Sequence, residues 1–194
     1  HGKQVSLRSP GDALNLGIGM IYQHFKLVKP FTVAENIVLG MEQVKVLKTR
    51  ELEKQVKELS EEYKIKINPS SAIWQLSIGE QQRVEILKIL YRKADILILD
   101  EPTAVLTPDE VKELFGTLKN MAERGCAIIF ITHKMNEVME YADRITVLRD
   151  GRLVKAVKKE ETTETELAQL MVGREISMGR RNTKNTTRDD IVLQ

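Results

Sequence analysis

The chain has 194 residues, of which 42% are hydrophobic and 30% are charged, values typical of a soluble globular protein. Its net charge of +2 gives no electrostatic reason to expect a nucleic-acid-binding protein. The single cysteine, Cys126, excludes an intrachain disulfide and fits a reducing compartment, and its apolar neighbours predict a small buried residue. The apolar runs are far shorter than the roughly 20 residues of a membrane-spanning helix, and no signal peptide is visible.

The first half of the chain predicts one short strand and three helices. Residues 17–23 are predicted as the strand. Thr32 and Glu35 have the spacing of a capping box, which predicts a helix start. The apolar residues of 49–63 share one helical face. A loop becomes the third helix near Gly79.

The second half predicts two buried strands, at 95–100 and 126–132, because both runs are apolar. Between them, Thr107–Glu110 forms a second capping box, and Gly125 closes its helix. A short helix, a hairpin turning on Asp150-Gly151 and a capped helix follow in order over residues 133–142, 144–157 and 163–173. Alternating strands and helices predict an α/β fold with a parallel sheet.

Polar side chains follow both apolar strands. Asp100 and Glu101 end the first strand, and Thr132 and His133 end the second. Ligands of α/β sheets bind beyond the carboxyl ends of the strands, and an apolar strand ending in aspartate holds Mg²⁺ in phosphate-loop NTPases. Taken alone, the acid pair fits equally well a strand-end cap followed by a solvated loop residue.

A small hydroxyl residue and a glycine precede the helix near residue 79. Ser77 and Gly79 stand ahead of free backbone N–H groups that bind anions well, and glycine lets the backbone approach a phosphate closely. An ordinary serine N-cap is the alternative.

Together, the segments LSIGEQQR, ILILDEPT and IIFITHK resemble the ATPase subunits of ATP-binding cassette (ABC) transporters, and the resemblance extends over residues 1–173. The similar positions are Gln23 for the Q-loop glutamine, Leu76–Glu80 for the signature, Ile96–Glu101 for the Walker B strand with its catalytic glutamate, Ala104–Thr107 for the D-loop and His133 for the switch histidine. The resemblance implies an α/β, P-loop NTPase-like ABC cassette with a mostly parallel sheet and a helical subdomain at about residues 41–92. Residues 174–194 are expected to be a linker with the start of a second cassette.

The resemblance also implies roles for these residues. Glu101 would orient the attacking water and His133 would contact the γ-phosphate, while Asp100 and Gln23 would hold Mg²⁺, mainly through water. Residues expected to contact nucleotide, here or on a second cassette, are Gln23, Ser77, Ile78, Gly79, Glu80, Gln81 and Thr107. Because the donors are split between two cassettes, hydrolysis would require their closure.

ATP and Mg²⁺ are therefore the implied cofactors, yet the Walker A loop, G-x-x-x-x-G-K-[ST], is absent. Gly2-Lys3 is followed by Gln4 and is preceded by no glycine loop. The N-terminal part of the cassette is thus expected to be missing, and the chain alone is expected to be inactive although its parent hydrolyses ATP. The loss is expected to expose apolar surface or a sheet edge and to favour self-association.

Ile78 and Glu80 depart from the commonest signature, which has glycine and glutamine there. The variants resemble the importers of simple sugars or nucleosides that carry two fused cassettes. The implied partners are a second cassette, transmembrane permease subunits and, indirectly, a substrate-binding protein, with no nucleic acid. The implied location is cytoplasmic, on the inner face of the membrane. A helix of the membrane subunit would contact Tyr22, Phe25, Phe31 and Val33, for which core packing is the alternative.

Two other functions stay open. One is a soluble ABC-type ATPase acting on ribosomes or DNA. The separation of 54 positions from Gln23 to Ser77 (77 − 23) leaves no room for the long coiled coil of chromosome-type heads. The basic tail offers slight support for a ribosomal role. The other is a non-catalytic cassette fragment, which fits the missing Walker A loop, whereas the presence of Glu101 and His133 favours a truncated enzyme.

Overall fold

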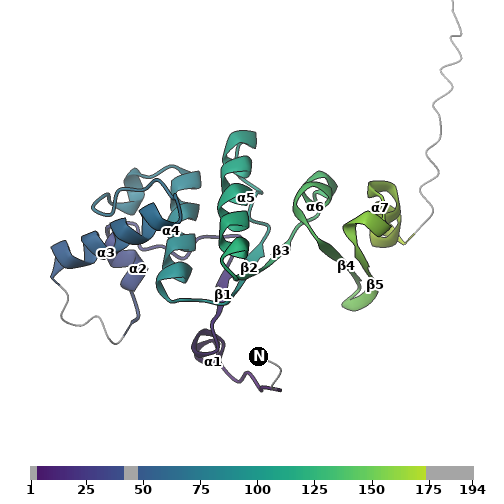
Figure 1. The fold of residues 1–194 in the computed structure, drawn as a ribbon, viewed down its shortest axis with the longest axis horizontal. Helices are drawn as coiled ribbons and strands as arrows, with labels where there is room; N and C mark the ends of the chain where they lie inside the picture. Colours follow the sequence, from purple (N-terminus) through teal and green to yellow (C-terminus); the bar gives the residue numbers. More distant parts are fainter. Residues whose placement is uncertain (1–3, 42–47, 174–194) are drawn as a thin grey trace, which may run out of the picture. The chain divides into compact units, whose positions relative to one another are not determined.

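The computed structural model describes residues 4–41 and 48–173. The chain divides into two compact units, residues 1–134 and 135–194. The first unit contains a parallel three-stranded sheet in the order β1-β2-β3, visible in Figure 1. Its strands are β1 (Ile18–Ile21), β2 (Ile96–Asp100) and β3 (Ala127–Ile131). The predicted parallel α/β arrangement is therefore present.

One face of this sheet forms the core of the first unit. Leu97 and Leu99 of β2 are fully buried there. α4 (Ile78–Tyr91) and α5 (Pro108–Glu123) both pack on strands of the sheet. The rings of Phe115 and Phe130 meet edge to face with centroids 5.3 Å apart. A side chain at Gly19 would lie 3.1 Å from Cδ1 of Ile89, so β1 can approach α4 only because it carries glycine there.

The strand predicted at residues 126–132 is present as β3, but the prediction that it is buried is wrong. Ile129 and Ile131 of β3 are each 50% exposed, and Cys126 is only partly buried, which still raises the pKa of its thiol. The reason is position: β3 lies at the edge of the sheet and pairs with β2 alone among the described strands. Met20, 36% exposed in the same row as Ile129, adds to the apolar surface, so the expected sheet edge and exposed apolar side chains are both present.

Three helices lie side by side at one end of the first unit, namely α2 (Val33–Val38), α3 (Thr49–Glu62) and α4 (Figure 1). Both predicted capping boxes are confirmed, with Thr32 accepting from the amide of Glu35 and Thr107 from that of Glu110. A further helix was not predicted, although Ser9 and Asp12 form the same kind of box around a proline. The remaining elements of this unit are α1 (Pro10–Asn15) and the 3₁₀ turn η2 (Ile73–Gln75).

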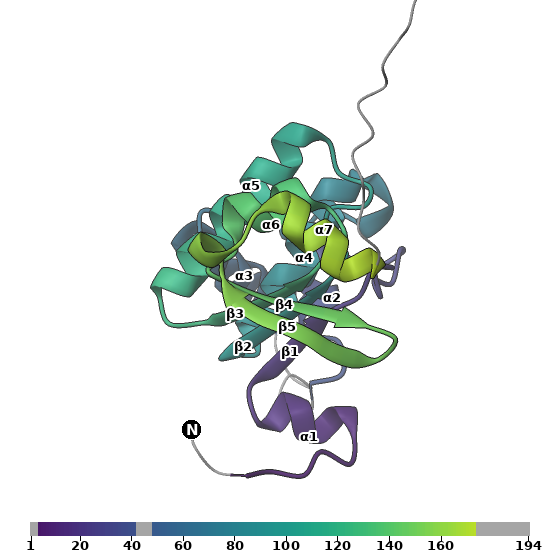
Figure 2. The same ribbon diagram turned by 90° about the vertical axis from the view of Figure 1, so that its right-hand side faces the viewer.

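The second unit is a hairpin with helices. β4 and β5 pair antiparallel and turn at Asp150-Gly151, as predicted. α7 packs on β4 (Figure 2) and stops at Gly173, whose φ is +75°. The elements are α6 (Met135–Tyr141), β4 (Arg144–Arg149), β5 (Arg152–Lys158), η3 (Lys159–Glu161) and α7 (Glu164–Val172). The predicted linker, residues 174–194, lies outside the described residues, and among those described no helix is both long and apolar enough to cross a membrane.

Candidate functional site

The carboxyl ends of β2 and β3 bring the predicted acid pair and histidine to the same edge of the sheet. Asp100 is the last residue of β2 and pairs with Ile131, the last residue of β3. The amide of Glu101 donates to the carbonyl oxygen of Ile131 at 2.9 Å. His133 follows two residues later. The parallel arrangement thus produces the predicted juxtaposition.

Glu101 stands at the centre of a polar cluster with Gln23 and His133. Nδ1 of His133 lies 3.0 Å from Oε1 of Glu101, and Nε2 of Gln23 donates to Oε2 at 3.4 Å. The Glu101 side chain remains 32% exposed. Two predicted site residues, Gln23 and His133, therefore contact the solvent-accessible carboxylate of a third, Glu101, and the three come from separate segments.

The backbone at Glu101 is left-handed, with φ of +44°. A non-glycine residue in this region carries strain of order 1–3 kcal/mol, which persists only where the surroundings fix it. They do so here. Gln82 donates to the carbonyl of Pro102 at 2.7 Å, and Nζ of Lys134 donates to the carbonyl of Thr103 at 2.8 Å. The constrained turn aims the Glu101 carboxylate at His133.

The contact between Glu101 and His133 constrains the protonation of the imidazole ring. An ionised carboxylate only accepts hydrogen bonds, so Nδ1 carries a proton when it bonds to Glu101. The contact therefore selects the tautomer that carries a proton on Nδ1.

Buried polar side chains fix the segment that follows Gln23. Oε1 of Glu85, a buried residue of α4, accepts from the amide of Lys26 at 2.7 Å. Asn36 of α2 accepts from the amide of Val28 at 2.7 Å and donates back to its carbonyl at 3.1 Å. These side chains satisfy a loop backbone that lacks sheet partners, so Gln23 extends from an anchored loop.

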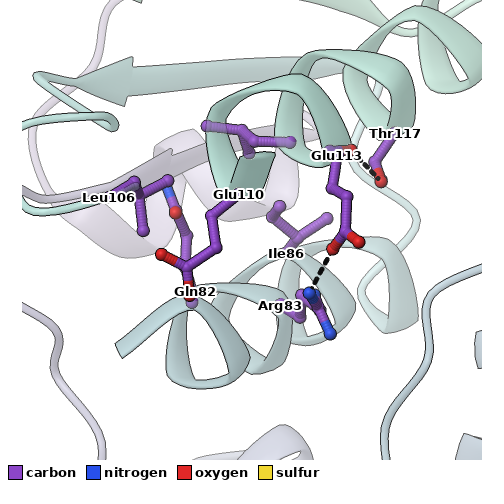
Figure 3. Close-up of a pocket in the computed structure, with 9 residues that line it drawn as sticks. Gln82, Arg83, Ile86, Leu106, Glu110, Glu113 and Thr117 are labelled. Carbon is purple, nitrogen blue, oxygen red and sulfur yellow. Dashed lines mark hydrogen bonds and ion pairs between the residues drawn. The ribbon is translucent and has the colours of Figure 1, made fainter. Parts of the chain in front are cut away.

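The interface between α4 and α5 holds a cavity of ≈20 Å³ (Figure 3). This volume is about that of a single water, so the cavity is no cofactor site. Its lining includes Gly79 and Gln82 of α4 and Glu110 and Glu113 of α5. The cavity therefore lies where α4 meets α5, and residues of both helices line it.

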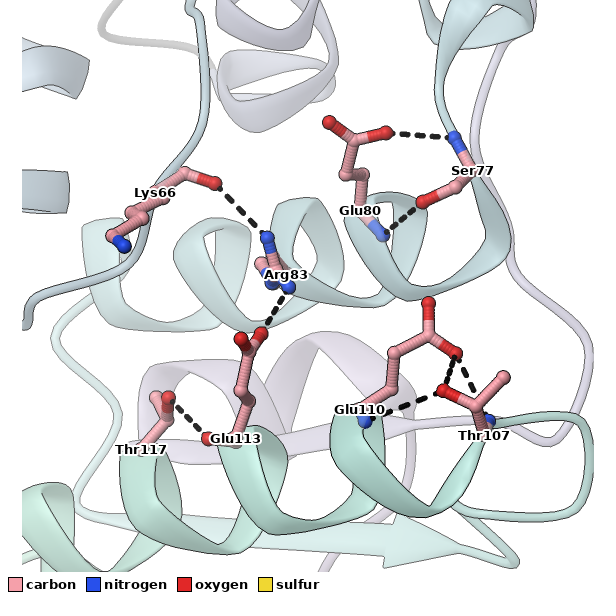
Figure 4. A network of polar contacts seen from close by, with 8 residues as sticks. All are labelled: Lys66, Ser77, Glu80, Arg83, Thr107, Glu110, Glu113 and Thr117. Atoms are coloured by element: carbon pink, nitrogen blue, oxygen red, sulfur yellow. Dashed lines mark hydrogen bonds and ion pairs between the residues drawn. The ribbon is translucent and has the colours of Figure 1, made fainter.

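The signature turn forms a closed hydrogen-bonded unit (Figure 4). Oγ of Ser77 accepts from the amide of Glu80 at 3.2 Å, and the amide of Ser77 donates to Oε2 of Glu80 at 2.8 Å. Nε2 of Gln81 donates to the carbonyl of Leu76 at 3.0 Å. Ile78 is 48% exposed, whereas Gly79 is buried. The serine N-cap alternative is thus correct for the structure of this turn, and its role toward a phosphate remains a prediction.

Thr107 likewise caps α5 within its own turn. It bonds to Glu110 in a complete capping box. The structure therefore gathers Gln23, Glu101 and His133 into one cluster and keeps the signature residues and Thr107 in separate helix-start turns. Sequence reasoning missed Gln82 and Lys134, whose side chains hold the turn after Glu101.

The acid pair fits a Mg²⁺ site of the nucleotide-dependent kind. Among residues 4–41 and 48–173, no group of three or more His, Cys, Asp or Glu side chains is placed to hold a metal ion. Mg²⁺ is commonly bound through one or two carboxylates together with water and substrate phosphates. Asp100 at the strand end, with Gln23 reaching the same edge, supplies that donor set without a cage of protein ligands.

Of the four residues expected to contact a membrane subunit, two are exposed, Phe25 is half-buried and one is buried, and the contact itself remains a prediction. Tyr22 and Phe31 are 49% and 39% exposed, whereas Val33 is fully buried in the core and cannot belong to it. Trp74, 67% exposed, was missed. Its amide donates to the carbonyl of Lys29 at 3.2 Å, which places it beside the segment that carries Phe31. A lone tryptophan in a polar loop was the available signal.

A parallel α/β sheet with an acid pair and a histidine at its carboxyl edge agrees with the expected ABC cassette of the P-loop NTPase type. Residues 2–104 match the ABC transporter family, and the chain belongs to that family. It is 53% identical over 178 residues to the nucleoside import ATP-binding protein NupA of Lactococcus lactis subsp. cremoris, covering 91% of this chain and 35% of that protein.

The guanosine import ATP-binding protein NupO of Bacillus subtilis is 51% identical over 179 residues, with 91% of this chain and 35% of that protein covered. The chain thus spans about a third of the length of these relatives. Among solved structures, it matches the dimeric cassette MJ0796 bound to ADP and Pi, in a post-hydrolysis state, with a TM-score of 0.62 and 27% identity, covering 73% of this chain and 62% of that one. The predicted fold class is confirmed.

Proposed function

We propose that this chain is the ATP-hydrolysing part of an ABC importer and that the full-length gene product couples ATP hydrolysis to uptake. The observation that carries this proposal is the Glu101 cluster, in which an exposed carboxylate on a strained turn bonds His133 at 3.0 Å and Gln23 at 3.4 Å. Phosphoryl transfer needs positioned groups and charge stabilisation more than covalent chemistry. The cluster supplies both.

Each residue of the cluster has a task in the proposed hydrolysis. Glu101 accepts a hydrogen bond from the attacking water and aligns it for in-line attack. His133 stabilises negative charge on the γ-phosphate oxygens, and Gln23 positions the water and the metal's water shell. Mg²⁺, held through Asp100, would neutralise phosphate charge when bound. Ser77, Ile78, Gly79, Glu80, Gln81 and Thr107 would face the nucleotide of a second cassette.

Nucleosides are the favoured substrate class within the predicted range of simple sugars and nucleosides, because NupA and NupO are both named for nucleoside import. The proposed partners are a second cassette, permease subunits and, indirectly, a substrate-binding protein, on the cytoplasmic face of the membrane. Tyr22, Phe31 and Trp74, all exposed near the Q-loop segment, are proposed to contact the permease. Residues 1–173 would be the cassette, and 174–194 the linker toward a second one.

The test is Glu101→Gln in the full-length gene product assembled with its permease. The amide keeps the shape of the side chain but cannot polarise water as a carboxylate does. We expect kcat for ATP to fall by about 100-fold or more, with binding of Mg-ATP retained. The matched control is Glu58→Gln on the solvent side of α3, where the side chain is 63% exposed. Full activity of Glu101→Gln would contradict the proposed site.

The isolated chain offers a separate test. No G-x-x-x-x-G-K-[ST] sequence occurs in its 194 residues, and this loop supplies most phosphate contacts in such folds. We expect titration of the purified chain with Mg-ATP to show no micromolar affinity. Light scattering over a concentration series should show self-association through the exposed apolar sheet, and a monomer at every concentration would contradict that part.

A further inference from the structure

The turn that opens α4 packs on the first turn of α5, where Gly79 lies against the side chain of Glu110, which Figure 3 labels. Gly79 is buried. A methyl group at this position would lie 2.8 Å from Cδ and 3.2 Å from Cγ of Glu110, and closer still to Oε1. Carbon atoms do not approach to 2.8 Å without displacement. The space that a side chain would need is therefore filled by the Glu110 side chain.

Glu110 is not free to swing away. Its Oε2 accepts from the amide and from the hydroxyl of Thr107, both at 2.9 Å (Figure 4). These donors hold the pKa of the Glu110 carboxyl below its ordinary value. Because Oε2 is bound to Thr107, Oε1 remains against Gly79. A larger residue at 79 must therefore break the cap of α5 or move α4.

Two further contacts fix α4 on the elements that follow β2. Arg83, one turn after Gly79, forms an ion pair with Glu113, and its Nη1 donates to the carbonyl of Lys66 at 3.3 Å. Gln82, which is buried, donates to the carbonyl of Pro102 at 2.7 Å. The signature turn is thus set against both α5 and the loop that carries Glu101.

We propose that Glu110 is a positioning residue for the signature turn and that position 79 requires glycine because the Glu110 carboxylate occupies the place of its side chain. Through Thr107, Glu110 fixes the spacing between the signature turn and the D-loop. The functional part of this inference rests on the proposed ATP hydrolysis, whereas the contact itself does not. It adds a packing reason for glycine at 79 to the expectation that glycine lets the backbone approach a phosphate closely.

The orientation of the turn supports this packing reason. The space beside the Cα of Gly79 is occupied by α5, while Ser77 and Ile78 are exposed. A phosphate approaching the helix start would meet the hydroxyl and the backbone N–H groups of this exposed side. Their position depends on how close α4 lies to α5, and Glu110 sets that distance.

The experiment is a double-mutant cycle between Gly79→Ala and Glu110→Ala in the full-length gene product with its permease. Gly79→Ala should lower kcat for ATP by about 100-fold, since small displacements of positioning groups have effects of that size, with KM for Mg-ATP unchanged. Glu110→Ala should lower kcat by about tenfold and vacate the space. The double variant should then be no worse than Glu110→Ala, because the added methyl finds room.

Two variants complete the design. Glu110→Gln keeps both the shape of the side chain and an acceptor for Thr107, so its kcat should stay near the wild-type value. Gly116→Ala, on α5 where a side chain meets nothing within 4 Å, is the matched glycine control and should leave activity unchanged. If Gly79→Ala fails to assemble, kcat for ATP is compared between Glu110→Gln and Glu110→Ala. Equal kcat values of these two variants would overturn the proposal.

The cycle also separates failure of this inference from failure of the proposed function. Losses that multiply in the double variant would show that glycine at 79 serves something other than space for Glu110. Melting temperatures are measured on the same proteins and should show the same coupling, with Gly79→Ala destabilising only when Glu110 is present. An absence of wild-type ATPase activity would overturn the proposed function, while the coupling in melting temperature would still test the contact.

Discussion

The Glu101 cluster and the signature turn are built in opposite ways. The cluster joins side chains 78 and 32 positions apart along the chain, on a backbone turn with positive φ. The signature turn bonds mainly within itself, through a capping box that spans four residues. The Glu101 cluster depends on the arrangement of the whole sheet, whereas the capping box of the signature turn forms between residues that are close in the sequence. Removal of a side chain of the cluster should therefore lower activity, whereas removal of the Ser77 cap should mainly lower local stability.

A loss of turnover comparable to that of Glu101→Gln is expected for His133→Ala in the full-length gene product. Removal of a group that stabilises charge in the transition state typically costs 10²- to 10³-fold in rate, so kcat for ATP should fall by about 100-fold or more. The melting temperature should change little, because His133 is 64% exposed and its bond to Glu101 is solvent-accessible. A variant with wild-type turnover would remove His133 from the site.

The strained turn can be separated from the carboxylate by comparing Glu101→Gly with Glu101→Ala. Both lose the carboxylate and should be equally inactive. Glycine accepts a φ of +44° without a Cβ clash, so it should be more stable than alanine by about 1 kcal/mol in denaturant unfolding. Equal stability of the two variants would mean that the turn is unstrained.

Ser77→Ala tests the local character of the signature turn. Loss of an N-cap hydroxyl costs about 1 kcal/mol, and the amide of Glu80 loses its acceptor. Ser77→Thr keeps a capping oxygen and should recover most of the stability in the same denaturant titration. If Ser77→Ala unfolds like the wild type, the cap is not what orders the start of α4.

The smallest expected effect is a pH dependence at Glu110. Hydrogen bonds from Thr107 hold the pKa of this carboxyl below its ordinary value. A carboxyl with a lowered pKa in the folded state contributes stability above the unfolded pKa and loses it as the pH falls. The melting-temperature difference between wild type and Glu110→Gln should therefore be constant near neutral pH and shrink below about pH 4. A difference that does not change down to pH 3 would contradict this linkage.

The features predicted correctly from sequence are those encoded over short distances. The capping boxes at Thr32 and Thr107 span only four residues each, and the hairpin at Asp150-Gly151 needs only its turn. The meeting of Glu101 with His133 followed from one topological rule, because both residues follow parallel strands. These predictions required no knowledge of which helix packs on which.

The errors arose where neighbours decide the outcome. Ile129 and Ile131 belong to a run as apolar as that of β2, yet the position of β3 at the sheet edge leaves them half exposed. The contact of Gly79 with Glu110 joins residues from two helices whose packing no local pattern encodes. Val33 was grouped with surface aromatics because sequence proximity cannot distinguish the two sides of α2.

The buried carboxylate of Glu85 connects α4 to the backbone amide of Lys26, which is 59 positions away in the sequence. Its bond to the amide of Lys26 couples the loop beyond Gln23 to the helix that begins with the signature. A rotation of α4 would carry this loop with it or leave Glu85 without its donor, which is costly for a buried acid. A movement of α4 should therefore be transmitted to the loop that follows Gln23.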